Sequence, residues 1–339
     1  MATYLRIVDV KLTTTTEAFD LPEWKSLLAS DPNRHIFLTQ EYNRVWWEAF
    51  GSNKDLYVLT FLDPEPVGLA AIMRDKTNEG LRLRFLGGDD LSDYLGPITA
   101  GEEYHPLVAD ALLSYLTKEM VDWDYFDAKC LPVPMGIADR MVDAADRLGL
   151  DFTIEQDEIT AVLSLPEDFE TYLDKLDRKN RHELKRKMRR LDREAPGSRL
   201  VTSQPETMDQ DLLAFFGLHL LSEGLKGKFL RPERATFFAR LAEVFAPMGM
   251  LSLDFLEIDG KKIASTFSFV FEETFYLYNS AYDPSLKRLS PGLILVTKLI
   301  QRSIAEGHRL FDFLRGSERY KFDLGAEALP LHSLVISRG

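Results

Sequence analysis

The sequence predicts a mixed α/β protein made of two copies of one domain, each a mostly antiparallel sheet flanked by helices. Two observations lead to this prediction. The chain has 339 residues, which is enough for two domains of ordinary size. The same order of elements (hairpin, third strand, helix, closing strand) also occurs twice, roughly 185–195 residues apart.

The first copy begins with two apolar runs on either side of the turn Asp63-Pro64-Glu65-Pro66, a pattern typical of a hairpin. A helix is predicted where apolar residues recur at helical spacing after Gly96-Pro97. The predicted elements are strands at 56–62, 67–73, 81–86 and 123–130, and a helix at 105–120.

The second copy turns at Asp259-Gly260, a strong hairpin signal. Its helix begins near Ser290-Pro291-Gly292 and runs to Glu306, where Gly307 is a suitable left-handed cap. The predicted strands are 251–258, 263–271, 275–282 and 310–314. We therefore divide the chain into an N-terminal domain, 1–165, and a C-terminal domain, 166–339.

A basic helix is predicted at the start of the second domain, over 169–194, because apolar residues recur every three or four positions. Residues 178–193 carry nine Lys and Arg against Glu183 and Asp192, a local charge of +7. The whole chain has a net charge of −13, and subtracting +7 leaves −20 for the remainder. The average therefore argues against nucleic-acid binding by the whole surface, but not against a local phosphate site.

The basic helix has two interpretations. Its cations could bind phosphates, either of a nucleic acid or of a phosphorylated small molecule. Alternatively, they form a solvated face that pairs with an otherwise acidic protein.

The start of the second-domain helix is a candidate cofactor site. A helix that begins with Ser290, Pro291 and Gly292 leaves backbone N–H groups pointing outward, and together with the helix dipole they favour an anion. Lys287 and Arg288 add positive charge beside it. A pyrophosphate fits this description. A plain Ser-Pro helix cap is the alternative.

The stretch FDFLRGSERYK, residues 311–321, follows the last predicted strand, where α/β proteins tend to bind ligands. Asp312 could orient a donor or act as a base, a role for which Asp93 is the other candidate, and Tyr320 is a candidate acid for a thiolate leaving group. Arg315 and Lys321 are candidate substrate contacts. A buried ion pair between Asp312 and Arg315 or Arg319 is the competing interpretation.

The loop 87–97 gathers Asp89, Asp90, Asp93 and Tyr94. Clustered carboxylates could bind an amine acceptor, although a plain acidic loop is also consistent with the sequence. The spacing does not match a calcium loop, and the six histidines lack metal-ligand spacing, so we expect no metal.

Cys130 is the single cysteine, which excludes an internal disulfide and favours a reducing compartment. The sequence contains no apolar run near the ~20 residues of a membrane span, and its first residues do not resemble a signal peptide. We therefore expect a cytoplasmic protein.

The ordered set of motifs from 178 to 326 resembles the GNAT-type acyltransferase domain of the Fem-like and cellulose-biosynthesis-type (BioF2-like) families. The matching pieces are RKNRHELKRKMRRLDRE, FFGLHLLSEGLKGKF, the hairpin from DFLEIDGKK to YNSAYDP, LSPG and FDFLRGSERYK. The first half adds FLTQEYNRVWWEAFG and LSDYLGP. Unlike single GNAT enzymes, the chain lacks the Gln/Arg-x-x-Gly-x-Gly/Ala loop, and FDLGA replaces the Trp-containing stretch that usually follows YK.

The resemblance implies two tandem GNAT folds that transfer an acyl group to an amine or hydroxyl. Acetyl-CoA or another acyl-CoA is the expected cosubstrate, bound at 288–292. Fem-type ligases use aminoacyl-tRNA instead, which the basic helix 178–193 would suit. The acceptor would be a small molecule or a cell-envelope precursor.

We predict an acyltransferase with its acceptor in a cleft between the domains, near Asp93, Tyr94 and Tyr320. Its rivals are an aminoacyl-tRNA-dependent ligase and a non-catalytic binding protein that keeps the fold. The oligomeric state stays open. The predicted site residues are, as catalytic groups, Asp93, Tyr94, Asp312 and Tyr320; as cofactor contacts, Lys287, Arg288, Ser290 and Gly292; and as substrate contacts, Tyr282, Arg315 and Lys321.

Overall fold

The computed structural model describes residues 8–88, 90–120, 122–221 and 231–338, and the chain divides into two compact units. Unit 1 comprises residues 1–159 and 329–339, and unit 2 comprises residues 160–328. The boundary differs from the predicted one in two ways. It lies at 159/160 rather than 165/166, and residues 329–339 belong to unit 1 although the predicted second domain includes them.

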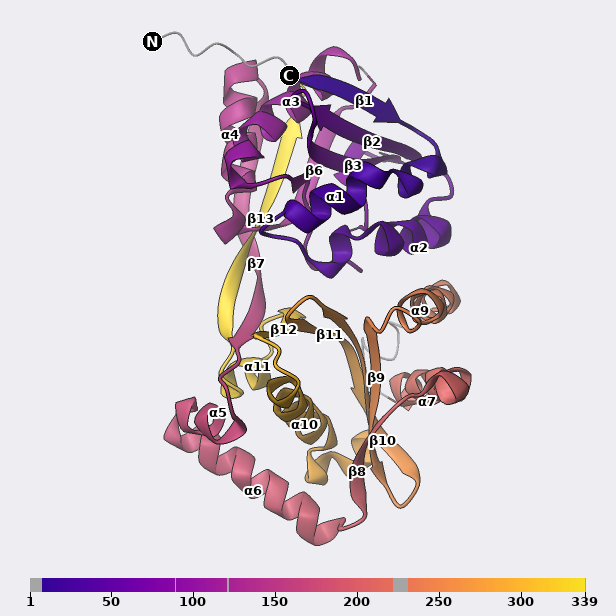
Figure 1. Ribbon diagram of the computed structural model, residues 1–339, viewed down its shortest axis with the longest axis vertical. Helices are drawn as coiled ribbons and strands as arrows, with labels where there is room; N and C mark the ends of the chain where they lie inside the picture. Colours follow the sequence, from indigo (N-terminus) through magenta and orange to yellow (C-terminus); the bar gives the residue numbers. More distant parts are fainter. Residues whose placement is uncertain (1–7, 89, 121, 222–230, 339) are drawn as a thin grey trace. The chain divides into compact units, whose positions relative to one another are not determined.

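In the sheet of unit 1, the third strand of the repeated plan, β4, runs parallel to the closing strand, β6 (Figure 1). The strand pairs β1–β2, β2–β3, β3–β4 and β6–β13 are antiparallel. The C-terminal strand β13 pairs with β6, so the end of the chain completes the sheet of the first unit. The strands, in spatial order, are β1 (Asp9–Thr13), β2 (Asp55–Leu62), β3 (Pro66–Thr77), β4 (Gly80–Phe85), β6 (Tyr125–Pro132) and β13 (Glu327–Ser337), with β5 (Ile98–Thr99) beside β3.

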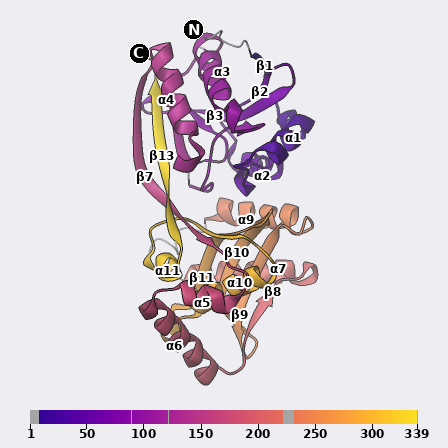
Figure 2. The same cartoon turned by 60° about the vertical axis from the view of Figure 1, so that its left-hand side comes forward.

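The helices of unit 1 cover both faces of this sheet, α1 and α2 on one and α3 and α4 on the other (Figure 2). The sheet and its helices enclose an apolar core, with aromatic pairs such as Phe85–Phe126 inside it. The helices are α1 (Pro22–Ser30), α2 (Gln40–Phe50), α3 (His105–Lys118) and α4 (Ile137–Leu148), with short 3₁₀ turns η1 (Thr16–Asp20), η2 (Ile36–Leu38), η3 (Glu102–Tyr104) and η4 (Val133–Met135).

Unit 2 repeats the plan. Its sheet is completed by the end of β7, whose residues 160–164 pair with β12. The strands are, in spatial order, β7 (Asp151–Ser164), β12 (Leu310–Arg315), β11 (Thr274–Tyr282), β10 (Lys261–Phe271), β9 (Leu251–Ile258) and β8 (Ser198–Thr202). Strands β11 and β12 are parallel, and the other neighbours in this path are antiparallel.

Helix α10 lies on one face of the unit 2 sheet, together with α5 and α6, and helices α7 and α9 lie on the other (Figures 1 and 2). The second face is aromatic, since Phe267 of β10 packs against Phe215 and Phe238. The helices are α5 (Phe169–Lys175), α6 (Arg178–Glu194), α7 (Met208–Leu221), α9 (Pro232–Phe245), α10 (Pro291–Ala305) and α11 (Arg319–Asp323), with 3₁₀ turns η5 (Pro205–Thr207) and η6 (Pro284–Leu289).

The predicted fold class, a mixed α/β protein with two tandem domains of one plan, is confirmed. One predicted element is wrong in detail, because the helix over 169–194 is two helices. Leu176 is extended, and the carboxylate of Asp177 then caps α6 by accepting from the N–H groups of Lys179 and Asn180. A local capping bond therefore competes successfully with the continuous apolar stripe.

Candidate functional site

The start of helix α10 has the geometry of an anion site. Ser290 precedes the helix in the left-handed conformation, with φ 56°, and its side chain makes no capping bond. Pro291 is the first helical residue, and the first intrahelical bond runs from the N–H of Ile294 to the carbonyl of Ser290. Helix geometry thus leaves the N–H groups of Gly292 and Leu293 without a partner within the helix, at its positive end.

Gly292 allows the chain to pass close to Tyr282, the last residue of β11. A Cβ atom added at Gly292 would lie 3.2 Å from Cδ1 of the Tyr282 ring, which is tighter than ordinary contact. Tyr282 as a whole is 40% exposed. The structure therefore brings together two of the predicted residues, one cofactor contact and one substrate contact.

Two cations precede the helix, Lys287 and Arg288, both exposed on turn η6. Helix α6 contacts this turn through a hydrogen bond and an ion pair. Nη1 of Arg190 donates to the carbonyl oxygen of Arg288 at 2.9 Å, and the Arg288 side chain forms an ion pair with Glu194. We call residues 287–292 the donor loop from here on.

Strands β11 and β12 separate beside the donor loop. They pair in parallel over Thr274–Tyr276 and Leu310–Asp312, and no further pair is recorded over the rest of these two fully described strands. Parallel neighbours that diverge in this way leave the remaining N–H and C=O groups of β11 on that side available to another extended chain.

Strand β11 also contains an irregularity next to this opening. Phe267 of β10 is opposite Asn279 and Phe269 is opposite Tyr276, so β11 has one residue more than β10 between these pairs. The bulge lies at Leu277 and Tyr278. Such bulges redirect backbone groups out of the regular ladder and are common next to active sites.

The end of β12 is held in an unusual conformation. Leu314 has a φ of 60°, and Oδ1 of the buried Asp312 accepts from its N–H group at 2.7 Å. Lys321 is 3% exposed, and its ammonium group donates to the carbonyl oxygens of Leu314 at 3.1 Å, Arg315 at 2.6 Å and Gly316 at 3.3 Å. These bonds occupy the donors of Lys321 within the strand-end turn, which favours a positioning role over the predicted substrate contact.

Tyr320 packs against Phe313 with ring centroids 6.2 Å apart. Burial raises the pKa of its hydroxyl well above the ordinary value, and the Glu318 carboxylate adds to this effect. A phenol with a raised pKa keeps its proton more firmly than a thiol does. Tyr320 is therefore better suited to donating a hydrogen bond to a thiolate than to transferring a proton to it.

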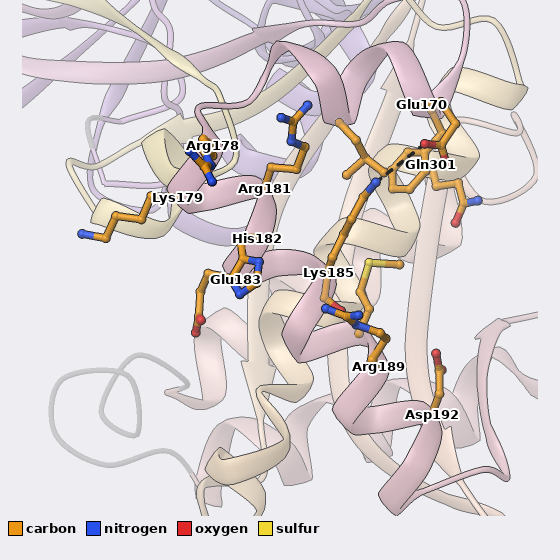
Figure 3. A pocket seen from close by; sticks show the side chains of 13 residues that line it. Glu170, Arg178, Lys179, Arg181, His182, Glu183, Lys185, Arg189, Asp192 and Gln301 are labelled. Carbon is orange, nitrogen blue, oxygen red and sulfur yellow. Dashed lines mark hydrogen bonds and ion pairs between the residues drawn. The ribbon is translucent and has the colours of Figure 1, made fainter.

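A groove of about 1200 Å³ runs along helix α6, with α5 and residue Gln301 of α10 on its other side (Figure 3). Its apolar lining comes from Phe169, Leu173 and Met188. The charged lining has five cations against three carboxylates, and the lining residues with polar or charged side chains are Glu170, Arg178, Lys179, Arg181, His182, Glu183, Lys185, Arg189, Asp192 and Gln301.

Four of these cations, at positions 178, 181, 185 and 189, form one row because they are three or four residues apart on the helix. Arg181 pairs with Asp174 at 2.6 Å, and Lys185 lies 3.8 Å from Glu170. Within the described ranges, Arg178 has no recorded acidic partner. The first turn of α6 contains no acidic residue, although acids are favoured at that end of a helix.

The remaining predicted residues belong to unit 1. Tyr94 is buried, with its ring 5.4 Å from that of His35, and Asp93 next to it is partly exposed. Asp89, from the same predicted cluster, lies outside the described residues, as does the stretch 222–229 of the FFGLHLLSEGLKGKF motif. Because Asp312 and Tyr320 belong to unit 2, the predicted cleft between the domains stays a prediction.

The described part of the chain contains no group of three or more His, Cys, Asp or Glu side chains placed to hold a metal ion. Over the same residues, the helices include none with the length and apolar character that crossing a bilayer requires.

Sequence reasoning missed how helix α6 contacts the donor loop. Arg190 and Glu194 are 98 and 94 residues away from Arg288, and no local pattern links them. Their charges were visible in the sequence, but their partners were not.

Residues 178–322 match the family model described as an acetyltransferase (GNAT) domain. No curated protein matches the chain in sequence. Among solved structures, FemX is similar with a TM-score of 0.67 at 12% identity, covering 96% of each chain.

A conserved protein of unknown function from Bacteroides thetaiotaomicron is similar with a TM-score of 0.63 at 15% identity, covering 97% of this chain and all of that one. L-PGS from Bacillus licheniformis has a TM-score of 0.54 at 14% identity, with 94% and 92% covered. At these identities the likeness is one of fold. The family match assigns a GNAT domain to residues 178–322, and the fold of the whole chain is similar to that of FemX.

Proposed function

We propose that the protein transfers an acyl group from an acyl-CoA to an amine or hydroxyl acceptor, and that the donor binds in unit 2. One observation carries the proposal: β11 and β12 stop pairing after Tyr276 and Asp312, and the positive end of α10 lies in the connection between them. An extended ligand with a phosphate at one end fits such an opening.

Each part of the donor would have a partner in this arrangement. The pyrophosphate would accept from the N–H groups of Gly292 and Leu293, with Lys287 and Arg288 beside it. The two amides of the pantetheine arm would pair with the edge of β11 that diverges from β12, as an added strand does. The acyl group would then reach the bulge at Leu277 and Tyr278.

The chemistry requires a polarised carbonyl and a deprotonated acceptor. An N–H group that the bulge turns out of the ladder would bind the carbonyl oxygen as negative charge develops on it. The acceptor nitrogen attacks the acyl carbon, the bond to sulfur breaks, and the acceptor proton passes to a base. Asp312 is our candidate base in unit 2, and Asp93 stays a candidate from the sequence.

The test is acyl-CoA turnover with Arg288→Ala and Ser290→Val. We expect KM for the donor to rise about tenfold in the Arg288 variant, the effect of one lost charged contact of ~1.4 kcal/mol. Arg309→Ala is the control, because Arg309 is an exposed cation of unit 2 paired with Glu273. Unchanged donor KM in both donor-loop variants would remove the pyrophosphate assignment.

A second candidate is an aminoacyl-tRNA-dependent ligase, favoured by the row of four cations in the α6 groove. About four phosphate contacts would make log K for tRNA fall with a slope near −3 against log salt concentration. Reversing the charges of Arg178, Arg181, Lys185 and Arg189 should abolish this binding. Unchanged tRNA binding after the charge reversal would exclude this second candidate function.

A third candidate, a non-catalytic protein that keeps the fold, predicts no thermal stabilisation by any acyl-CoA. A bound donor at 100 times its Kd should add about 2.7 kcal/mol to the free energy of unfolding. A small-molecule or cell-envelope acceptor and a cytoplasmic location stay predictions.

A further inference from the structure

The C-terminal end of helix α6 supports the donor loop. The carbonyl of Arg288 accepts from Arg190, and Leu286 and Leu289 of turn η6 pack against the core cluster that contains Leu191. Glu194, the last residue of the helix, contacts the side chain of Arg288. Helix and loop are thus joined by backbone, apolar and charged contacts.

Glu194 is at an unfavourable position for an acid. The C-terminal end of a helix carries the negative pole of its dipole, which repels a carboxylate. Two guanidinium groups offset this repulsion: Arg193 donates to Oε1 at 3.0 Å and Arg288 donates to Oε2. The same cations hold the pKa of Glu194 below its usual value, Arg193 having the largest effect. Glu194 is therefore charged at neutral pH.

The Glu194 carboxylate occupies a donor that a phosphate would use. Arginine binds carboxylate and phosphate oxygens through the same N–H groups. Among the contacts recorded for the described residues, Glu194 is the only carboxylate paired with a donor-loop cation. The Arg288 side chain is 76% exposed, so a ligand can reach it from solvent.

We infer that Glu194 is an internal competitor of the donor's phosphate: it holds Arg288 while the donor loop is empty, and the arriving phosphate displaces it. The displaced carboxylate keeps its bond to Arg193, so the exchange leaves no charge unpaired. Glu194 is a positioning residue in this account, and it sets donor affinity through Arg288. The inference rests on the proposed donor site.

The test measures the Kd of coenzyme A by calorimetry at low salt for the wild type, Glu194→Gln and Glu194→Asp. Removing the competing charge should tighten binding about two- to fivefold in Glu194→Gln, the range for one exposed ion pair. The gain should shrink at 0.5 M salt, where such charges are screened. Glu194→Asp keeps the charge and should bind coenzyme A like the wild type.

Glu183→Gln is the matched control. Glu183 is also on α6 and also pairs with two cations, Arg186 and Lys187, but has no recorded contact with the donor loop. Its replacement should leave the Kd unchanged. Circular dichroism checks that all variants retain their helices.

The outcomes separate the two claims. Equal or weaker binding by Glu194→Gln would overturn the inference and leave the proposed donor intact. A wild type that does not bind coenzyme A at all would remove the proposed donor, and the inference with it.

Discussion

Units 1 and 2 share one scaffold. In each, a parallel strand pair is short: β4 and β6 pair at Arg82–Tyr125 and Leu83–Phe126, and β11 and β12 at three positions. The closing strand of each unit also carries a non-glycine residue with positive φ, Cys130 at 58° and Leu314 at 60°.

The two units differ beyond the third strand. In unit 1 the chain returns to the closing strand, since the N–H of Leu95 donates to the carbonyl of Cys130 at 3.0 Å. Helix α3 there is preceded by Glu102 and Glu103, whereas α10 of unit 2 is preceded by Lys287 and Arg288. In unit 1 the chain itself thus fills the opening between the two parallel strands, and acidic residues precede the helix. In unit 2 the two strands stay apart, and cations precede the helix.

The fold alone therefore does not define a donor site. Both units offer the positive end of a helix after a third strand, but only the unit 2 helix has a start that suits a phosphate. We therefore expect the donor in unit 2 alone.

The largest predicted effect is on the free energy of unfolding. It concerns the hydrogen bonds that fix the residue with positive φ in each unit. In unit 1 the N–H of Leu95 donates to the carbonyl of Cys130, whereas in unit 2 the ammonium group of Lys321 donates to the carbonyl of Leu314 and Asp312 accepts from its N–H. Lys321→Met has nearly the same length but leaves three carbonyls without their donor, which should cost about 3 kcal/mol of unfolding free energy. Hydrogen exchange should locate the loss in unit 2; a loss spread equally over both units would contradict the comparison.

A second prediction concerns acid stability, which should differ between the units through His35. Burial lowers the pKa of His35 to about 3, and its Nδ1 has no hydrogen-bond partner among the residues that the structure describes. The unfolded chain binds a proton near pH 6.5 and the folded chain does not. The stability that neutral His35 contributes is therefore complete above pH 6.5 and is lost as pH falls toward 3.

Urea unfolding of the wild type and His35→Phe between pH 7 and 4 measures this contribution. The wild type should lose about 3 kcal/mol more than the variant over that range. Asp31 and His105 line the same small cavity and are present in both proteins, so the difference isolates His35. If the free energy of unfolding changed equally with pH in the two proteins, burial of His35 would not lower its pKa as predicted.

The smallest predicted effects come from two glycines, one in each unit. A Cβ at Gly68 would lie 2.4 Å from Cγ2 of Val108, whereas one at Gly292 would meet the Tyr282 ring at 3.2 Å. Gly68→Ala should cost about 1–3 kcal/mol of stability through overpacking, with no change in donor KM. Gly292→Ala should raise donor KM a few fold and leave stability nearly unchanged. A raised donor KM in Gly68→Ala together with an unchanged donor KM in Gly292→Ala would contradict the placement of the donor site in unit 2.

The sequence could predict the elements whose signals are local. The hairpin at Asp259-Gly260 follows from residues that accept positive φ, and both have it. The predicted strand 251–258 and the helix beginning after Ser290 match β9 and α10. Positions that need left-handed or capping residues are specified by those residues themselves.

The sequence could not predict β7, because the first part of this strand is mostly exposed and lacks the apolar alternation that marks a strand. It could not predict β13 because the partner of that strand, β6, lies far earlier in the chain. It also could not predict which side chains meet around the donor loop. In the sequence, Glu194 is one more charged residue at the end of a solvated helix. Its ion pair with Arg288 follows only from the fold.

The most direct test of a single donor site is the stoichiometry of coenzyme A binding by calorimetry. We expect one site per chain, lost in the double variant Lys287→Glu/Arg288→Glu and retained in the matched unit 1 variant Glu102→Lys/Glu103→Lys. Two sites per chain, or undiminished binding after charge reversal at the donor loop, would contradict the account.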